Sequence, residues 1–349
     1  MISDIFFPLQ FVYLRSQKMS IKVAVVGFGF MGQTHTGTLL QLQDTEITGI
    51  IDLRSPVEQL NTIKGNNDTV VLTPEAAAKL PWFRSWEEFI AKAGAPDAVI
   101  VALPTKFHCS AVVKALENGC HVMVEKPFAT SVEEAEKMLN SARKNDRLLA
   151  VGYVVRCMPE YLHLAETLRT ERLGKVHFLE MRRFAGIPGW GSWLDPEMVR
   201  HSGGTLFDLL SHDLDFVTHT LGEPEAILPR RRGRKEFMGD WLSIDLQYKG
   251  FDVVVESAFI PPVSYPFHRS FQAFFENGSL YSGEWNKVAE CSGKEVKNIR
   301  LPETSPYFTE VANFINSVKQ GKLQGICSGD DALITTRHCA EIRHALQED

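Results

Sequence analysis

One lysine in the sequence stands where a strand is expected to end and a helix to begin. Residues 122–124 are apolar, the tripeptide Glu125-Lys126-Pro127 follows directly, and Ser131 is placed to cap the next helix. A lysine at the carboxyl end of a strand in an open α/β sheet lies where such sheets bind ligands. There the ammonium group of Lys126 can polarise a hydroxyl or carbonyl oxygen. A solvated lysine at a strand end is the alternative explanation.

A second group of ionisable residues follows a pair of glycines. In the run RHSGGTLFDLLSHDLDF, three of them (Asp208, His212 and Asp215) recur at i, i+4 and i+7, which places them on one face of a helix. A histidine flanked by carboxylates can be held in one tautomer and accept a proton. The alternatives are a helix face with acids near its N-terminus, or an Asp-x-x-x-His zinc pair. Because the other cysteines and histidines show no closing ligand pair, we expect no metal.

A third motif has the spacing of a dinucleotide-binding turn. An apolar strand runs into Gly27-x-Gly29-x-x-Gly32 and a helix, and a second strand ends on Asp52 about twenty residues later. Gly27 allows the tight turn, Gly29 lets the backbone approach a pyrophosphate, and Gly32 lets helix and strand pack closely. Asp52 would accept from the ribose hydroxyls and repel a 2′-phosphate, which favours NAD over NADP. Arg54 could instead accommodate the phosphate, and a tight turn without a ligand is the alternative.

The three motifs together resemble the Gfo/Idh/MocA oxidoreductases, a family named for glucose–fructose oxidoreductase, inositol dehydrogenase and a rhizopine-catabolism protein. The resemblance covers nearly the whole chain from Ser20 onward, and its specific parts are Glu125-Lys126-Pro127 and Asp208-x-x-x-His212. One departure is Ser202, which replaces the first of three glycines that usually precede the aspartate. Further matching residues are Gly27, Phe28, Gly29, Phe30, Met31, Gly32, Pro104, Thr105, His108, Tyr153 and Arg156.

The resemblance implies an α/β protein with an N-terminal Rossmann dinucleotide-binding domain and a C-terminal α+β domain that has a large, mostly antiparallel sheet. One face of that sheet would carry the substrate site and the other an oligomer contact, so we expect a homodimer or homotetramer. The resemblance also implies a cis peptide before Pro127. Its catalytic residues would be Lys126, Asp208 and His212.

The reaction expected from this resemblance is hydride transfer between NAD and a carbinol carbon of a sugar, polyol or sugar derivative, with NADP the less favoured cofactor. His212 would take the hydroxyl proton, oriented by Asp215 or Asp208, and Lys126 would stabilise the developing alkoxide. Asp208 would also accept from an adjacent hydroxyl. Two other classes stay open: an NAD-dependent glycosidase without net redox, and a non-catalytic dinucleotide-binding regulator.

The expected site residues form two overlapping sets. Those at the cofactor are Gly27, Phe28, Gly29, Phe30, Met31, Gly32, Asp52, Arg54, Pro104, Thr105, His108, Glu125 and Lys126. Those at the substrate are Lys126, Arg156, Trp193, Asp195, Asp208, His212 and Asp215. Core packing stays open for Trp193, helix capping for His108, and a surface ion pair for Arg156.

Four segments are expected along the chain. They are a loosely ordered extension over 1–19, the Rossmann domain over 20–155, the substrate-binding and oligomerisation domain over 156–328, and a helix that folds back on the first domain over 329–349. In the second domain, strands are expected to turn at Lys249-Gly250 and at Asn277-Gly278.

Composition excludes several classes of protein. The formal charge of −6 and the lack of an extended basic patch argue against nucleic-acid binding. No segment approaches the roughly 20 apolar residues that span a membrane. The six cysteines show no disulfide framework, so we expect reduced thiols in a cytoplasmic protein.

Overall fold

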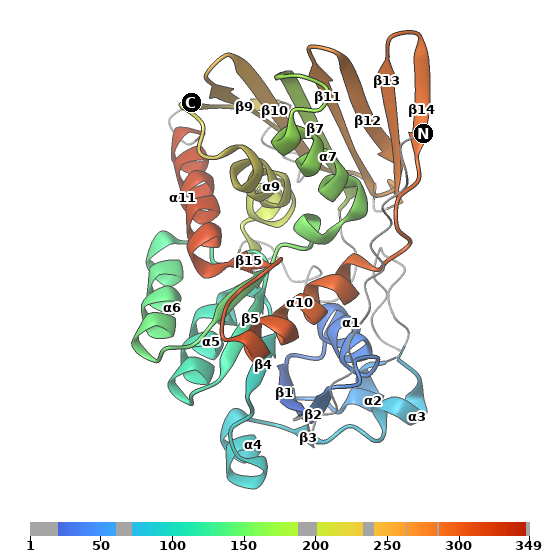
Figure 1. Cartoon of the computed structure of the whole chain (residues 1–349). Helices are drawn as coiled ribbons and strands as arrows, with labels where there is room; N and C mark the ends of the chain where they lie inside the picture. Colours follow the sequence, from blue (N-terminus) through green and yellow to red (C-terminus); the bar gives the residue numbers. More distant parts are fainter. Residues whose placement is uncertain are drawn as a thin grey trace.

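The computed structural model describes residues 20–60, 72–187, 201–232, 241–262, 264–284 and 286–346. These residues form two parts, each built on one β-sheet (Figure 1). None of the helices in these ranges is both long and apolar enough to cross a membrane. All six cysteines are free thiols, and only Cys291 is not buried.

The first part is a seven-stranded sheet in the order β15-β6-β5-β4-β1-β2-β3. Its strands are β1 (Ile21–Val26), β2 (Thr45–Ile51), β3 (Trp82–Phe83), β4 (Ala98–Val101), β5 (His121–Glu125), β6 (Leu149–Gly152) and β15 (Cys327–Ser328). All pairs from β6 to β3 are parallel, and β15 is antiparallel to β6. In this doubly wound order, ligands bind at the carboxyl ends of the strands, beside the reversal between β1 and β4.

Helices cover both faces of this sheet because its central strands are apolar on both sides. The helices are α1 (Phe30–Leu39), α2 (Pro56–Gln59), α3 (Pro74–Ala77), α4 (Trp86–Ala93), α5 (His108–Glu117) and α6 (Val132–Lys144). Along β1, Val23 and Val25 pack in one core with Leu39 of α1, while Ala24 and Val26 pack in another core with residues of α5 and α6.

The second part is an eight-stranded sheet in the order β14-β13-β12-β11-β7-β10-β9-β8. Its strands are β7 (Val176–Gly186), β8 (Ala226–Arg232), β9 (Trp241–Tyr248), β10 (Phe251–Ile260), β11 (His268–Phe275), β12 (Gly278–Glu284), β13 (Lys287–Ser292) and β14 (Glu295–Ile299). Only β7 and β10 pair in parallel; every other described pair is antiparallel. The expected mixed architecture, a Rossmann part followed by a mostly antiparallel sheet, is confirmed.

One face of the second sheet is covered by helices (Figure 1). They are the 3₁₀ helix Val154–Cys157, α7 (Pro159–Thr170), the π-helix Thr205–Leu210 and α9 (Ser211–Leu221). Leu179 and Met181 of β7 pack there with Tyr161 of α7 and Val217 of α9.

The two expected hairpins differ in outcome. β9 and β10 turn at Lys249-Gly250, with Tyr248 paired to Phe251, as predicted. The second turn is one residue earlier than predicted, because Phe275 pairs with Gly278 and the connection is Glu276-Asn277. Gly278 belongs to the strand, and a Cβ there would lie 2.6 Å from the backbone oxygen of Cys291. Close approach of β13, rather than a turn, therefore requires this glycine.

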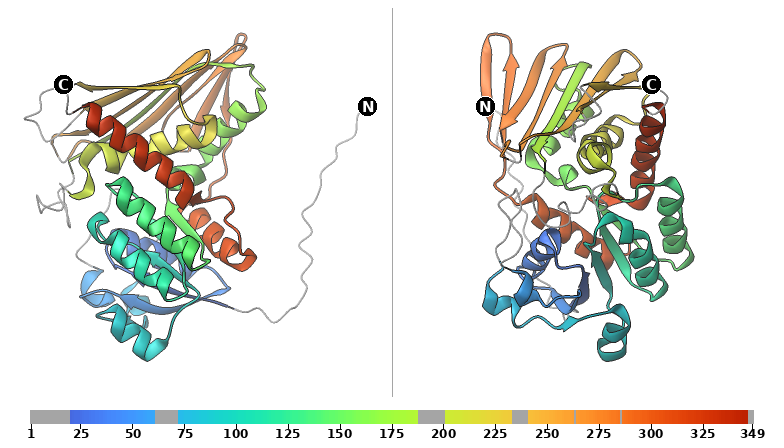
Figure 2. Two further views of the ribbon diagram at one scale, coloured as in Figure 1. Left: turned by 90° about the vertical axis from the view of Figure 1, so that its left-hand side faces the viewer. Right: turned by 180° about the vertical axis from the view of Figure 1, so that it is seen from behind.

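The C-terminal segment returns to the first part earlier than residue 329. Helix α10 (Pro306–Gln320) packs against α1, and its Val311 and Phe314 lie in a core of the first sheet. After β15, helix α11 (Gly329–Ala345) lies beside both α6 and α9 (Figure 2). Ion pairs join Arg143 to Asp330 (2.6 Å) and Glu136 to Arg337 (2.8 Å). The last two helices and β15 thus connect the two parts.

Candidate active site

Lys126 stands directly after β5, at the carboxyl edge of the first sheet. The Lys126–Pro127 peptide is cis, and Phe128 and Ala129 behind it are buried. Ser131 then caps α6 by accepting from the backbone N–H of Glu134 at 3.2 Å. The strand end and the capped helix together fix the backbone that carries the ammonium group.

The Lys126 side chain reaches across to the second part of the molecule. Its Nζ donates to Asp208 Oδ1 at 2.8 Å and to the backbone oxygen of Asp208 at 3.1 Å. The two side chains are 20% and 19% exposed, so the pair is partly buried but accessible to a small molecule. The structure therefore brings together two residues that are 82 positions apart in the sequence.

Asp208 and His212 sit on a helical segment that begins irregularly. The π-helix Thr205–Leu210 carries Asp208, and α9 begins at Ser211, whose hydroxyl donates to the Phe207 carbonyl at 2.6 Å. Before it, Gly203 and Gly204 have φ angles of +80° and +61°. Such angles favour glycine, which explains this pair in the motif.

His212 is 8% exposed, and its ring meets that of Tyr153 edge-on with centroids 6.1 Å apart. Burial lowers the pKa of His212 well below its usual range, and the positive charges of Lys126, Arg183 and Arg269 lower it further. The imidazole is therefore neutral at neutral pH and able to accept a proton. Within the residues that the structure describes, its Nδ1 has no hydrogen-bond partner.

The expectation that a carboxylate orients His212 is not supported. Asp208 binds Lys126, and Asp215 forms a bidentate ion pair with Arg156, at 2.7 Å to Nε and 2.8 Å to Nη2. Asp215 is fully buried and also accepts from Thr335 at 3.2 Å. Arg156 and Asp215 therefore hold the 3₁₀ helix, α9 and α11 together, and the substrate contacts expected of them stay predictions.

The glycine-rich turn has the shape that a dinucleotide requires. Gly27 has φ +92°, and a Cβ there would lie 2.6 Å from the Ala102 carbonyl oxygen; a Cβ at Gly32 would collide with the carbonyl oxygen of Gly27. Around Gly29, by contrast, the space is open. Gly29 provides no side-chain cap for α1, so the first N–H groups of the helix remain available to a phosphate.

Asp52 stands beside this turn at the end of β2. Its Oδ2 accepts from the Phe28 N–H at 2.8 Å and its Oδ1 from the Arg54 N–H at 3.1 Å. A carboxylate oxygen has two lone pairs, so each keeps acceptor capacity for a ribose hydroxyl. The Arg54 side chain is exposed and donates to Gln59 at 3.4 Å. These residues fit NAD or NADP.

The other predicted cofactor residues divide between the site and the interior. Pro104 and Thr105 follow the end of β4, next to β1 and β5, and both are partly exposed, as are Phe30 and Met31. Phe28 is fully buried.

His108 is also interior, at 1% exposed, and burial lowers its pKa. Its ring nitrogens lie 3.0 Å from the Pro127 carbonyl oxygen and 2.8 Å from that of Leu103. It therefore links the loops after β4 and β5.

Glu125 also lies in the interior. It is 6% exposed and its Oε1 lies 2.6 Å from Nε2 of His35 on α1. Sequence reasoning missed His35, although its position three residues after Gly32 could have marked it as part of the motif. Trp193 and Asp195 lie outside the described residues.

Comparison with known proteins agrees with this architecture. Residues 21–153 match the family described as "Oxidoreductase family, NAD-binding Rossmann fold", and residues 161–281 match the "GFO/IDH/MocA C-terminal domain". The UDP-N-acetylglucosamine 3-dehydrogenase structure from Acidithiobacillus ferrooxidans aligns with a TM-score of 0.74 at 20% identity, covering 94% of this chain and 98% of that chain. This likeness supports the fold.

Three curated relatives show the range of similar sequences. A D-glucoside 3-dehydrogenase of Escherichia coli is 32% identical over 58% of this chain and 55% of its own length. The scyllo-inositol 2-dehydrogenase (NAD(+)) of Bacillus subtilis is 27% identical over 58% and 54%. These matches span about half of each relative. A scyllo-inositol 2-dehydrogenase (NADP(+)) of the same organism is 22% identical over 86% of this chain and 87% of its own length.

Proposed function

The chain belongs to the Gfo/Idh/MocA oxidoreductase family, and from this we propose that it is an NAD(P)-dependent dehydrogenase acting on a CH–OH group of a sugar, a polyol or a sugar derivative. The relatives named above act on a glucoside, an inositol and a nucleotide sugar according to their names. Their common chemistry is a ring that carries several adjacent hydroxyl groups. A ring of this type is the substrate class we assign to this chain.

The observation that carries the proposal is the contact between Lys126 and the helical segment that contains Asp208 and His212. The lysine comes from the carboxyl edge of the dinucleotide-binding sheet, and its Nζ lies 2.8 Å from Asp208 Oδ1 on the other part of the molecule. His212 follows Asp208 by one helical turn and is neutral because it is buried. This arrangement supports an acid–base role for the two residues, because open α/β sheets bind their ligands at the carboxyl ends of the strands.

Each of the three side chains has a distinct role in this proposal. In alcohol oxidation, neutral His212 accepts the hydroxyl proton of the substrate. Lys126 donates a hydrogen bond to the same oxygen and stabilises its developing negative charge. Asp208 fixes the ammonium group and accepts from a neighbouring hydroxyl. Bound at the glycine-rich turn, NAD or NADP would supply the nicotinamide carbon that exchanges hydride with the substrate.

The experiment that tests this function is a screen for NADH formation. The purified protein and NAD are incubated with inositols, aldoses, glucosides and nucleotide sugars, and NADH absorbance is followed. A substrate found in this way is then labelled with deuterium at the reacting carbon. We expect the deuterium to appear in the reduced cofactor.

Two outcomes would contradict the proposal. Release of a sugar from a glycoside without accumulation of NADH would indicate a glycosidase. Tight NADH binding with no turnover of any substrate class would indicate a regulator.

A further inference from the structure

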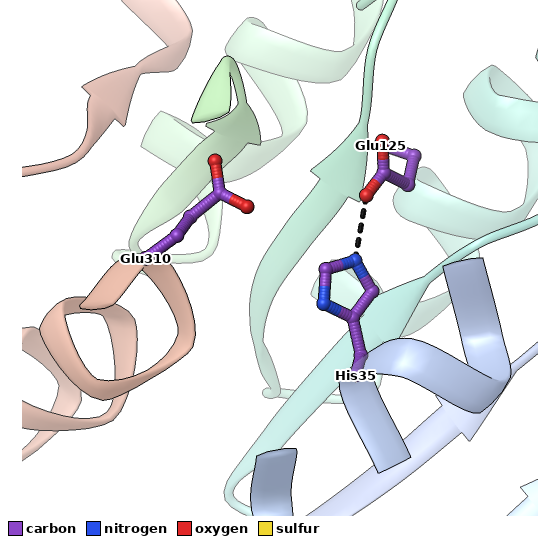
Figure 3. A group of neighbouring side chains, drawn as sticks. All are labelled: His35, Glu125 and Glu310. Carbon is purple, nitrogen blue, oxygen red and sulfur yellow. Dashed lines mark hydrogen bonds and ion pairs between the residues drawn. The ribbon is translucent and has the colours of Figure 1, made fainter. Parts of the chain in front are cut away.

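A buried group of three ionisable side chains lies behind Lys126. His35 comes from α1, Glu125 from the end of β5 and Glu310 from α10, and each offers one side-chain atom within 4.8 Å of the others (Figure 3). They are 0%, 6% and 1% exposed. Three elements far apart in the sequence therefore place polar groups at one interior point.

Glu125 contacts His35, Gly152 and the backbone of Lys126. Its Oε1 lies 2.6 Å from Nε2 of His35, and its Oε2 accepts from the Lys126 N–H at 3.1 Å. Gly152 of the neighbouring strand stands against it, since a Cβ there would lie 3.3 Å from the carboxyl carbon. The hydrogen bond to Glu125 therefore helps to fix the backbone of Lys126.

Glu310 completes the group from the opposite side (Figure 3). Neither of its carboxyl oxygens has a hydrogen-bond partner within the described part of the chain. His35 of α1 offers a ring nitrogen within 4.8 Å of it, and the other ionisable groups near it are Glu125 of β5 and Asp215 of α9, both acidic, and Cys157 of the 3₁₀ helix. Burial raises the pKa of Glu310 well above its usual range, and these two acids raise it further.

An ionised carboxylate in this position would be buried beside two acids and without a hydrogen bond from the described residues, which is strongly unfavourable. A protonated carboxyl group avoids that cost and can donate a hydrogen bond toward the pair in front of it. A divalent cation could also compensate two carboxylates, but it would require both to be ionised and would break the short contact between His35 and Glu125.

We propose that Glu310 is a neutral acid packed beside the His35–Glu125 pair, and that this buried group positions Lys126 for the reaction. The positioning role rests on the proposed function; the protonation of Glu310 does not. Glu125 and His35 are positioning residues in this proposal, because Glu125 accepts from the Lys126 N–H and His35 holds Glu125. Helix α10 thereby connects the C-terminal segment to the catalytic lysine.

Infrared spectroscopy of the full chain tests the protonation without any substrate. A buried carboxylic acid gives a C=O stretch that a carboxylate lacks and that shifts in D₂O. We expect this band in the wild type at neutral pH and its loss in Glu310→Gln. The matched control variant, Glu290→Gln, should keep the band. Absence of the band from the wild type, its survival in Glu310→Gln, or failure of that variant to fold would overturn the proposal. One equivalent of a tightly bound divalent metal in the purified protein would also overturn it.

Kinetics with a substrate found by the screen test the positioning role. Glu310→Gln should keep kcat within about threefold, because a neutral amide replaces a neutral acid. Glu125→Gln should lower kcat on the order of 10–100-fold, as expected for a group that orients a functional residue from behind, while the Kd of NADH stays unchanged. His35→Gln, which keeps a donor, should retain more activity than His35→Ala. Equal kcat losses in Glu125→Gln and Glu310→Gln would refute the proposed division of roles.

Discussion

The imidazole of His212 lies against Tyr153, and the charges that act on it are those of Lys126, Arg183 and Arg269. Its neutral state follows from burial and from these cations, and within the described ranges no carboxylate binds its Nδ1. The spacing of Asp208, His212 and Asp215 in the sequence predicted their shared helix. It could not predict that Asp215 would pair with Arg156, 59 residues away, because such a pairing depends on the tertiary fold.

The pH dependence of oxidation should report His212. Protonated His212 cannot accept the hydroxyl proton, and its pKa is lowered well below 6.5. The rate should therefore be insensitive to this group from about pH 7 upward and should fall only as pH drops well below 6.5. Steady-state kcat across pH measures this, and His212→Asn should remove the acid limb, whereas the exposed His177→Asn should keep it. A wild-type profile governed by a single ionisation above neutral pH would assign the base to another group.

Cofactor choice should depend on Asp52. A 2′-phosphate placed near its carboxylate would bring like charges together, so NADH should bind more tightly than NADPH by about tenfold or more. Asp52→Ser should reverse or remove this preference, since the exposed guanidinium of Arg54 could then bind the phosphate. Fluorescence titration of both reduced cofactors measures the ratio, with Asp252→Ser as the control. Equal or tighter binding of NADPH by the wild type would rule out the NAD preference.

At the scale of elements, the site depends on where strands end and how one helix begins. The glycine motif with its strand, helix and spaced acid could be predicted, because each feature is local in sequence. The π-helix Thr205–Leu210 and the strand position of Gly278 could not, since both depend on contacts with distant segments. The buried position of Glu310 could not be predicted for the same reason, because its neighbours His35 and Glu125 lie on other elements.

The start of the catalytic helix should be sensitive to Gly203. This residue has φ +80°, and a Cβ would lie 2.6 Å from the Cβ of Phe207. Gly203→Ala should therefore lose about 1–2 kcal/mol to backbone strain and a further ~1–3 kcal/mol to overpacking. Gly250 has φ +90° and open space around it, so Gly250→Ala should lose only the about 1–2 kcal/mol that is due to backbone strain. Chemical denaturation measures the free energy of unfolding of both variants. Similar losses of stability would show that Phe207 moves aside easily.

At the scale of the molecule, helices cover one face of the second sheet, and none of the described helices lies on the other, open face (Figure 2). Direct cross-strand pairs link Phe274, Ser279, Cys291 and Val296, so these four residues lie together on the open face. Its exposed apolar residues include Leu228, Phe274, Tyr281 and Val296. Exposed apolar surface of this kind is common at protein–protein contacts. We propose that this face forms the contact of a homodimer or homotetramer.

Light scattering after gel filtration tests the assembly. The wild type should elute as a dimer or tetramer, and the double variant Phe274→Glu, Tyr281→Glu should elute as a smaller species, because two charges would be buried in the contact. Leu162→Glu, at an exposed position of α7 away from this face, should leave the assembly unchanged. A monomeric wild type would exclude the proposed contact.

We propose that Lys126, held by Asp208, serves the chemical step and not cofactor binding. Lys126→Ala measured for both turnover and NADH affinity tests it most directly, with the exposed Lys92→Ala as control. Removing one positioned proton-transfer or charge-stabilising group typically costs about 10²–10⁴-fold in rate. We predict a loss of that size in kcat with an NADH Kd close to that of the wild type. Retention of more than about a third of wild-type turnover would contradict the assignment, given the size of effect expected for such a group.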